Sequence, residues 1–211
     1  MCFSATASFT AGAILTVTGI ASIKKTTKKA QIPFAAIPFI FGIQQLAEGF
    51  LWLSLSDKIS VNASLPMAYV FLFFAQILWP FWVPYSMLRA DRQKESKILL
   101  GIGLIVSLYL AFCLMSFPVI PKVEGHHIVY YQFYPPKLRV FGWILYLIAT
   151  VIPPLLSKIK GMKYFGAMIL FSCIIAIVFY EEYFISVWCY FAAVLSFTVY
   201  LIIHFMNKKS I

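Results

Sequence analysis

The sequence predicts an all-α integral membrane protein, a bundle of seven transmembrane helices with the N-terminus outside and the C-terminus in the cytoplasm. The chain of 211 residues is 62% hydrophobic and only 11% charged, whereas soluble domains are nearer half apolar and a quarter charged. Its apolar residues fall into seven long runs, and its positive charges gather in alternate connections between them. No run is left over for a soluble domain, so residues 1–211 are predicted to form one transmembrane domain.

Seven predicted helices account for most of the apolar residues. They are Phe3–Ile23, Gln31–Leu55, Leu65–Leu88, Ile98–Phe117, Val140–Leu156, Phe165–Tyr180 and Phe184–Phe205. Most of these runs approach the roughly 20 apolar residues that a helix needs to cross about 30 Å of hydrocarbon. Only helices and closed barrels satisfy their backbone hydrogen bonds inside a bilayer, and continuous apolar runs of this length exclude barrel strands.

Positive charge predicts the orientation of the bundle. Of the seventeen Lys and Arg residues, thirteen lie after the first, third, fifth and seventh spans, and four lie on the other side. Cytoplasmic connections are enriched in Lys and Arg, so the N-terminus is predicted outside. Positive charge follows the first span rather than preceding it, which argues against a cleaved signal peptide. The net charge of +10 is therefore attributed to topology and anionic lipid headgroups, not to nucleic acid.

The longest connection and a group of prolines carry two further structural predictions. The connection Pro118–Arg139 is rich in tyrosine and bounded by prolines. Because aromatic side chains favour the headgroup level, it is predicted to form an ordered or interfacial cap on the outer side. Pro80 and Pro84 in the third span, with Pro38, Pro153 and Pro154 elsewhere, predict kinked helices. The freed carbonyl groups could line a cavity, or packing could accommodate the kinks.

Glu48 is the only charged residue between Gln31 and Leu55. Gln44 and Gln45 precede it by four and three residues, so the three polar side chains share one face of the predicted helix. A carboxylate inside the hydrocarbon region is costly, which makes Glu48 a candidate functional residue. The alternative is a structural network of interhelical hydrogen bonds, each contributing roughly 0.6 to 2 kcal/mol.

Depth along the helices brings further candidates to the level of Glu48. With a rise of about 1.5 Å per residue, Glu48 lies roughly 12 Å below the outer surface, and Trp188 and Cys189 lie roughly 10 Å below it. Cys2 and Ser4 occupy the same layer, and Gln76 lies slightly deeper. The predicted ligand-binding residues are Glu48, Gln44, Gln45, Ser4, Trp52, Gln76 and Trp188.

A thiol or metal site is the second candidate in the same layer. It would be formed by Cys2 and Cys189 with His127, which lies in the outer connection above them. Thiolate, imidazole and carboxylate groups are metal ligands. The shared depth of Cys2 and Cys189 also permits a disulfide in an oxidising exterior. Buried cysteines more commonly act as small apolar fillers, and the His126–His127 pair can equally be part of a solvated loop. The cofactor is therefore left open, with a metal ion as one alternative.

Two well-known classes of seven-helix protein do not fit the sequence. A retinal protein needs a lysine in its seventh span, and Phe184–Phe205 contains none. Zinc hydrolases of the ceramidase and adiponectin-receptor type need several histidines near one membrane face. This chain has three histidines, two of them outside and His204 near the inside.

Three stretches of the chain carry a more specific resemblance: the opening MCFSATASF, then FGIQQLAEG, and SVWCYFAAVLSFTVYLIIHF near the end. They are similar to an uncharacterised family of bacterial multi-pass membrane proteins, DUF6629, whose members begin MCFSAxASF. The resemblance runs from Cys2 to His204, and Tyr190 stands where the family has phenylalanine. It implies a seven-helix protein of the bacterial plasma membrane and no established activity. The matching positions are Cys2, Ser4, Gln44, Gln45, Glu48, Trp52, His127, Trp188, Cys189 and His204.

Three functions remain open on the sequence alone. The first is a protein that binds or senses a small amphiphilic ligand in an outward-facing pocket centred on Glu48, because one acid among aromatic side chains suits a binding cavity. The second is a membrane-embedded enzyme that acts on a lipid through a thiol or metal. The third is a small carrier or a purely structural bundle. In each case the predicted partners are membrane lipids, and nucleic acid is not among them.

Overall fold

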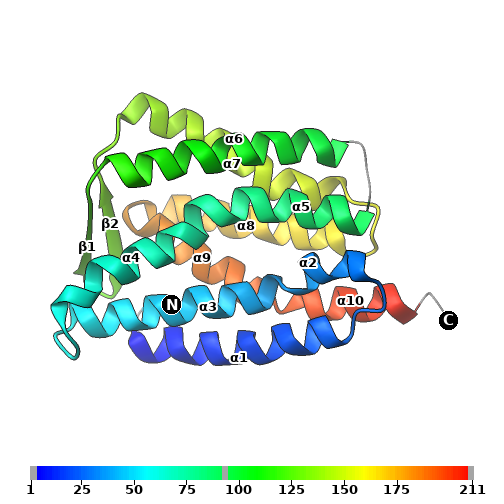
Figure 1. The fold of residues 1–211 in the computed structure, drawn as a ribbon, viewed down its shortest axis with the longest axis horizontal. Helices are drawn as coiled ribbons and strands as arrows, with labels where there is room; N and C mark the ends of the chain where they lie inside the picture. Colours follow the sequence, from blue (N-terminus) through cyan, green and yellow to red (C-terminus); the bar gives the residue numbers. More distant parts are fainter. Residues whose placement is uncertain (1–3, 92–94, 209–211) are drawn as a thin grey trace.

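The computed structural model describes residues 4–91 and 95–208, which form a bundle of roughly parallel and antiparallel helices with a β-hairpin across one end (Figure 1). The first four α-helices are α1 (Ala5–Lys24), α2 (Ile32–Ala35), α3 (Ile37–Leu55) and α4 (Ser64–Leu72). They are followed by the π-helix η3 (Phe73–Leu78), α5 (Trp79–Asp91) and α6 (Glu95–Ser116). The remainder comprises strands β1 (Val119–Glu124) and β2 (His127–Gln132), and helices α7 (Pro136–Leu156), α8 (Met162–Phe179), α9 (Phe184–Leu195) and α10 (Thr198–Lys208). Short 3-10 turns cover Lys29–Gln31, Val61–Ala63 and Glu181–Tyr183 (η1, η2 and η4).

The seven predicted spans are confirmed as helical segments. Within the described residues, seven segments are long and apolar enough to cross a membrane: Ala5–Lys24, Lys29–Leu55, Val61–Asp91, Glu95–Ser116, Arg139–Leu156, Met162–Phe179 and Glu181–Asn207. The second, third and seventh are each interrupted. α2 gives way to α3 at Ala36, two residues before Pro38, whose missing N–H cannot continue the helix. In the seventh, α9 ends at Leu195, and the Ser196 and Thr198 hydroxyls donate to carbonyls three residues earlier.

The predicted cap is a two-stranded antiparallel hairpin, a detail that the sequence did not predict. β1 and β2 pair from Val119–Gln132 to Glu124–His127, and Gly125 takes a positive φ of 61° in the turn. Ile128 and Tyr130 on β2 are buried. The Tyr130 ring stacks on Phe71 of α4 with centroids 5.2 Å apart, so the hairpin is packed onto the end of the bundle.

The third span bends through a π-helix that ends at a proline. The Trp79 N–H donates to the carbonyl of Phe74, five residues back, and Pro80 has no N–H to offer to Ala75. The Ala75 carbonyl instead accepts the Tyr146 hydroxyl at 2.6 Å, and the Ile77 carbonyl accepts the Ser107 hydroxyl at 2.7 Å. The predicted kink is therefore present, and neighbouring helices satisfy the carbonyl groups.

Small residues let the helices around α3 and α6 approach closely. A Cβ added to Gly19 of α1 would lie 2.3 Å from the Phe39 nitrogen of α3, and one added to Gly42 would lie 2.6 Å from Thr16 Oγ1. On α6, a Cβ at Gly103 would lie 1.9 Å from the Pro80 carbonyl oxygen, which Pro84 cannot bond because it lacks an N–H. Such close contacts are typical of helix pairs in membranes.

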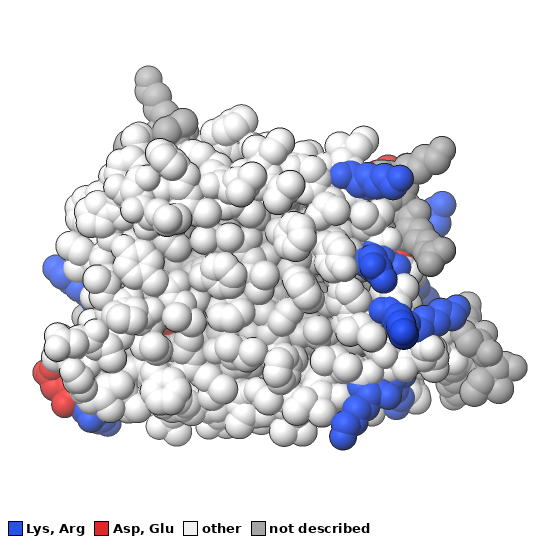
Figure 2. Space-filling view, viewed as in Figure 1, with Lys and Arg blue, Asp and Glu red and all other residues white. Residues whose placement is uncertain are grey.

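The two ends of the bundle differ in charge. Figure 2 shows Lys and Arg gathered at the end where α1 leads into α2 and where α5 and α10 finish. We call this the basic end, and the opposite end, which carries β1 and β2, the hairpin end. Lys24, Lys25, Arg89 and Lys158 follow or end helices that reach the basic end.

Gly103→Ala is expected to destabilise the protein by about 1–3 kcal/mol, because the new methyl group would collide with the Pro80 carbonyl and force α5 and α6 apart. Gly101→Ala on the same helix is the matched control. A Cβ there has nothing within 4 Å, and alanine favours a helix over glycine by about 0.5–1 kcal/mol. Thermal unfolding in detergent measures both variants, and equal midpoints would contradict the close contact.

Candidate functional site

The Glu48 carboxyl group is completely buried between α3 and α9. Its exposed fraction is 0%. The Ser186 hydroxyl of α9 donates to Glu48 Oε1 at 2.5 Å, and the Gln45 amide donates to Oε2 at 3.3 Å. The first of these bonds joins residues 138 positions apart in the chain. Glu48 therefore connects two of the apolar spans through a polar contact inside the bundle.

Gln44 extends this polar group towards α5. Its side-chain oxygen accepts the Trp79 indole N–H at 2.7 Å, and the Trp79 ring stacks on Phe41 with centroids 3.9 Å apart. The Cys189 thiol of α9 lies next to the Gln44 amide and near the Glu48 carboxyl group. We call Gln44, Gln45, Glu48, Ser186 and Cys189 the Glu48 cluster, and all five side chains are buried.

Buried donors near this cluster have no hydrogen-bond partner among the described residues. They include Trp52 Nε1 and Trp188 Nε1. Trp52 follows Glu48 by four residues and so lies on the same side of α3. A buried polar atom left unsatisfied costs about 1–3 kcal/mol. A molecule that offered hydrogen-bond acceptors to these N–H groups would therefore gain binding free energy.

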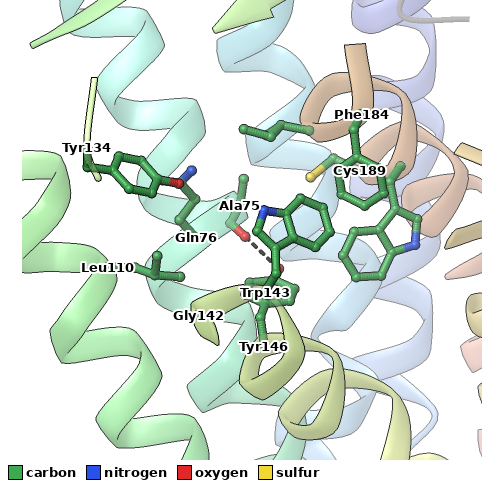
Figure 3. A pocket seen from close by; sticks show the side chains of 11 residues that line it. Ala75, Gln76, Leu110, Tyr134, Gly142, Trp143, Tyr146, Phe184 and Cys189 are labelled. Carbon is green, nitrogen blue, oxygen red and sulfur yellow. Dashed lines mark hydrogen bonds between the residues drawn. The ribbon is translucent and has the colours of Figure 1, made fainter. Parts of the chain in front are cut away.

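Two cavities border the cluster at Cys189, which lines both of them. The hairpin-side cavity (Figure 3) has a volume of about 50 Å³ and is lined by Ala75, Gln76, Leu110, Tyr134, Gly142, Trp143, Tyr146, Phe184, Ile185, Trp188 and Cys189. The central cavity, also about 50 Å³, is lined by Ile37, Phe41, Trp79, Val83, Tyr146, Thr150, Phe165, Ile169, Trp188, Cys189 and Ala192. A site for one water needs about 10–15 Å³ by this measure, so each cavity has room for a few waters or a short length of hydrocarbon chain.

Tyr146, Trp188 and Cys189 line both cavities and form the partition between them. The Tyr146 and Trp188 rings meet edge to face with centroids 5.7 Å apart. Tyr146 is held in place by its hydrogen bond to Ala75, drawn as a dashed line in Figure 3. Cys189 also borders the Glu48 cluster. The partition is thus the point where the cavities and the buried carboxyl group meet.

The polar edge of the hairpin-side cavity is connected to the hairpin. Gln76 of η3 and Gln132 of β2 exchange two amide hydrogen bonds, at 2.8 and 3.1 Å. In Figure 3, Gln76 and Tyr134 lie on one side of the cavity, and Phe184 and Cys189 lie on the other. The hairpin therefore closes the same end of the cavity that carries its polar side chains.

The structure brings together some of the predicted site residues and separates others. Gln44, Gln45, Glu48 and Cys189 meet, and Gln76 and Trp188 line the hairpin-side cavity. Glu48 itself lines neither cavity. Ser4 is the N-cap of α1, where its hydroxyl oxygen accepts the Ala7 N–H at 3.2 Å.

Only part of the predicted thiol or metal site lies among the described residues. Cys2 lies outside the described residues. His127 on β2 packs against the rings of Tyr183 and Tyr180, with centroids 4.5 and 5.5 Å away, and burial lowers the pKa of its imidazole. Among the described residues, no three His, Cys, Asp or Glu side chains are close enough to hold a metal ion.

Sequence reasoning missed three residues that the site depends on: Ser186, Trp79 and Tyr146. Each contributes one hydrogen bond to the Glu48 cluster or to the cavity wall. Ser186 could have been found from its spacing, because it precedes Cys189 by three residues and so shares a face of α9 with it. Trp79 and Tyr146 are aromatic residues in apolar spans, and nothing in their spacing distinguishes them from other core residues.

The seven apolar helical segments of the described residues indicate a multi-pass membrane protein. The profile of DUF6629, a family of unknown function, matches residues 1–210, and the chain belongs to this family. No curated protein and no solved structure matches the chain significantly.

Ser186→Ala is expected to destabilise the protein by about 1–2 kcal/mol, because it removes the closer of the two hydrogen bonds described above for the buried Glu48. Ser172→Ala is the matched control: Ser172 is also buried, but its hydroxyl only donates to the Ile169 carbonyl of its own helix. Chemical or thermal unfolding measures the stability of both variants. The same measurement on Glu48→Gln and on the double variant Glu48→Gln/Ser186→Ala gives the coupling free energy between Glu48 and Ser186. A coupling of zero would contradict the bond.

Proposed function

We propose that this protein binds a small amphiphilic molecule in the hairpin-side cavity, within the outer half of a cell membrane. The observation that carries the proposal is a cavity with aromatic walls and one polar edge, placed beside a buried carboxyl group. Ligand sites are typically concave and mostly apolar, with a few polar groups that fix orientation.

The charge of the two ends supports the placement of the cavity in the outer half. Lys and Arg gather at the basic end, and positively charged connections favour the cytoplasmic side. The hairpin end then faces outward. In this orientation the polar edge of the cavity, Gln76 with Gln132, lies nearer the outer surface, and the central cavity lies deeper.

The walls of the cavity suit an amphiphile better than an ion. Five of its eleven lining residues are aromatic, and none is charged. Ion pathways are instead lined with charged side chains or rings of carbonyl groups. The Trp143 and Phe184 rings, with centroids 4.1 Å apart, provide apolar contacts at the boundary between α7 and α9.

Cys189 gives the cavity a connection to the Glu48 cluster, and so a means of sensing its occupant. A molecule that pushes against Trp188 and Cys189 acts on α9. Ser186 lies on the same helix and holds Glu48 through a short hydrogen bond. Binding and the strength of the Glu48–Ser186 contact are therefore expected to depend on each other.

Leu110→Trp is expected to fill the hairpin-side cavity and to lower retention of the bound molecule at least about tenfold, a loss of roughly 1.4 kcal/mol of binding free energy. Leu108→Trp is the matched control, because Leu108 lies on the same helix with 64% of its surface exposed. Native mass spectrometry and extraction of gently purified protein measure the bound molecule in both variants and the wild type. An empty wild-type protein, or equal retention in both variants, would rule out this site.

A further inference from the structure

The two cavities form a series along one stripe of α7. Residues on this stripe are spaced by three or four positions and so share a helical face. The stripe begins at the hairpin end and continues past both cavities: Arg139, Gly142, Trp143, Tyr146 and Thr150. On α9 the facing residues Phe184, Ile185, Trp188, Cys189 and Ala192 follow the same pattern. A molecule that lies along these two stripes would pass the Tyr146–Trp188 partition.

The polarity of the lining changes along this path. The hairpin-side cavity is lined by the Tyr134 phenol and by Gln76, whose amide exchanges hydrogen bonds with Gln132. In the central cavity the Thr150 hydroxyl donates to the Tyr146 carbonyl at 2.9 Å, and the Trp79 indole donates to Gln44. The Trp188 indole N–H, which has no partner among the described residues, belongs to the partition that lines both cavities. Beyond the partition the walls therefore offer mainly hydrocarbon contacts. This order suits a molecule with its polar head at the hairpin end and its apolar tail towards the bundle centre.

The size of the cavities limits the shape of the tail. A cavity of about 150 Å³ is known to hold benzene, and each cavity here is about 50 Å³. A ring or a pair of acyl chains would need the helices to separate. A single unbranched chain has the smallest cross-section among lipid tails, so it requires the smallest displacement of Tyr146 and Trp188 at the partition.

Arg139 gives the head end of the path its charge. It precedes Gly142 and Trp143 by three and four residues on the cavity-facing stripe, and its side chain is exposed. It is close enough to Tyr134, a cavity-lining residue, to interact with its phenol electrostatically. Burial raises the pKa of Tyr134 to about 12, so its hydroxyl is protonated at neutral pH and can donate. A cation beside a neutral donor is an arrangement that binds anionic oxygen atoms.

From these observations we infer that the occupant is a single-chain amphiphile with an anionic head, whose carboxylate or phosphate binds at Arg139 and Tyr134 and whose chain runs through both cavities. This inference rests on the proposed function and adds the ligand class and a specificity-determining residue. The start of α7 lies at the same place, and the partial positive charge of a helix N-terminus favours an anion there. Fatty acids and lysophosphatidic acid share this chemistry.

The test compares four probes that differ in head or chain: oleate, 1-oleoyl lysophosphatidate, monoolein and dioleoyl phosphatidate. Native mass spectrometry in an uncharged detergent measures their relative binding to the full chain. Either oleate or lysophosphatidate is expected to bind at least about tenfold more tightly than monoolein, because a charge-assisted hydrogen bond to the head is worth that much. Which of the two binds better distinguishes a carboxylate from a phosphate source.

Variants of Arg139 test the residue. Arg139→Gln is expected to reduce the preference for the anionic probes over monoolein to within about twofold, whereas Arg139→Lys retains most of it because the charge is kept. Arg89→Gln, at the basic end of α5, is the matched control and keeps the full preference.

The outcomes separate this inference from the proposed function. Equal binding of monoolein and the anionic probes, or a preference that survives Arg139→Gln, overturns the assignment of the head group but leaves an amphiphile site. If dioleoyl phosphatidate binds as tightly as the anionic single-chain probes, the inference that the occupant has one chain is overturned. Absence of binding by all four probes, together with an empty wild-type protein, overturns both.

Discussion

The hydrogen bond from Ser186 to Glu48 is the contact on which the arrangement of the site depends. A carboxyl group with no solvent exposure must be hydrogen-bonded to be tolerated among apolar helices. Because the Glu48 carboxyl group accepts a hydrogen bond from Ser186, the face of α9 that carries Ser186 must lie against α3. Once that face is set, Cys189 points into the Glu48 cluster and Trp188 points towards α7. This choice also sets the cavity walls, because Trp188 and Cys189 of α9 line both cavities together with Tyr146 of α7.

The π-helix supplies the second constraint. A straight third span would donate from residue 79 to the Ala75 carbonyl, but the π turn and Pro80 together leave that oxygen without a backbone donor. Tyr146 provides the donor from α7, and this requirement holds its ring at the partition between the cavities. The irregular backbone at Pro80 thus positions one of the side chains that line both cavities.

The parts of this architecture that are local in sequence could be predicted, and those that depend on distant partners could not. Span lengths and the common face of Gln44, Gln45 and Glu48 follow from hydropathy and helical spacing, and the structure has both. The hairpin was expected only as an ordered cap, because its strands are short and are stabilised by packing on α4. Ser186 was missed because a serine in an apolar helix usually bonds its own backbone, as Ser172 does here. Its spacing of three residues from Cys189 is the one sequence feature that could have distinguished it.

The position of Cys189 explains how a small molecule could affect a buried carboxyl group that it never touches. Cys189 is one turn along α9 from Ser186, so the two residues move together when the helix moves. On its other side α3 packs closely against α1 at Gly19 and Gly42. A chain that displaces Trp188 acts directly on α9, which carries both Cys189 and Ser186. Because the Glu48–Ser186 bond is short and buried, a small displacement changes its strength, and by linkage the state of Glu48 changes affinity for the chain.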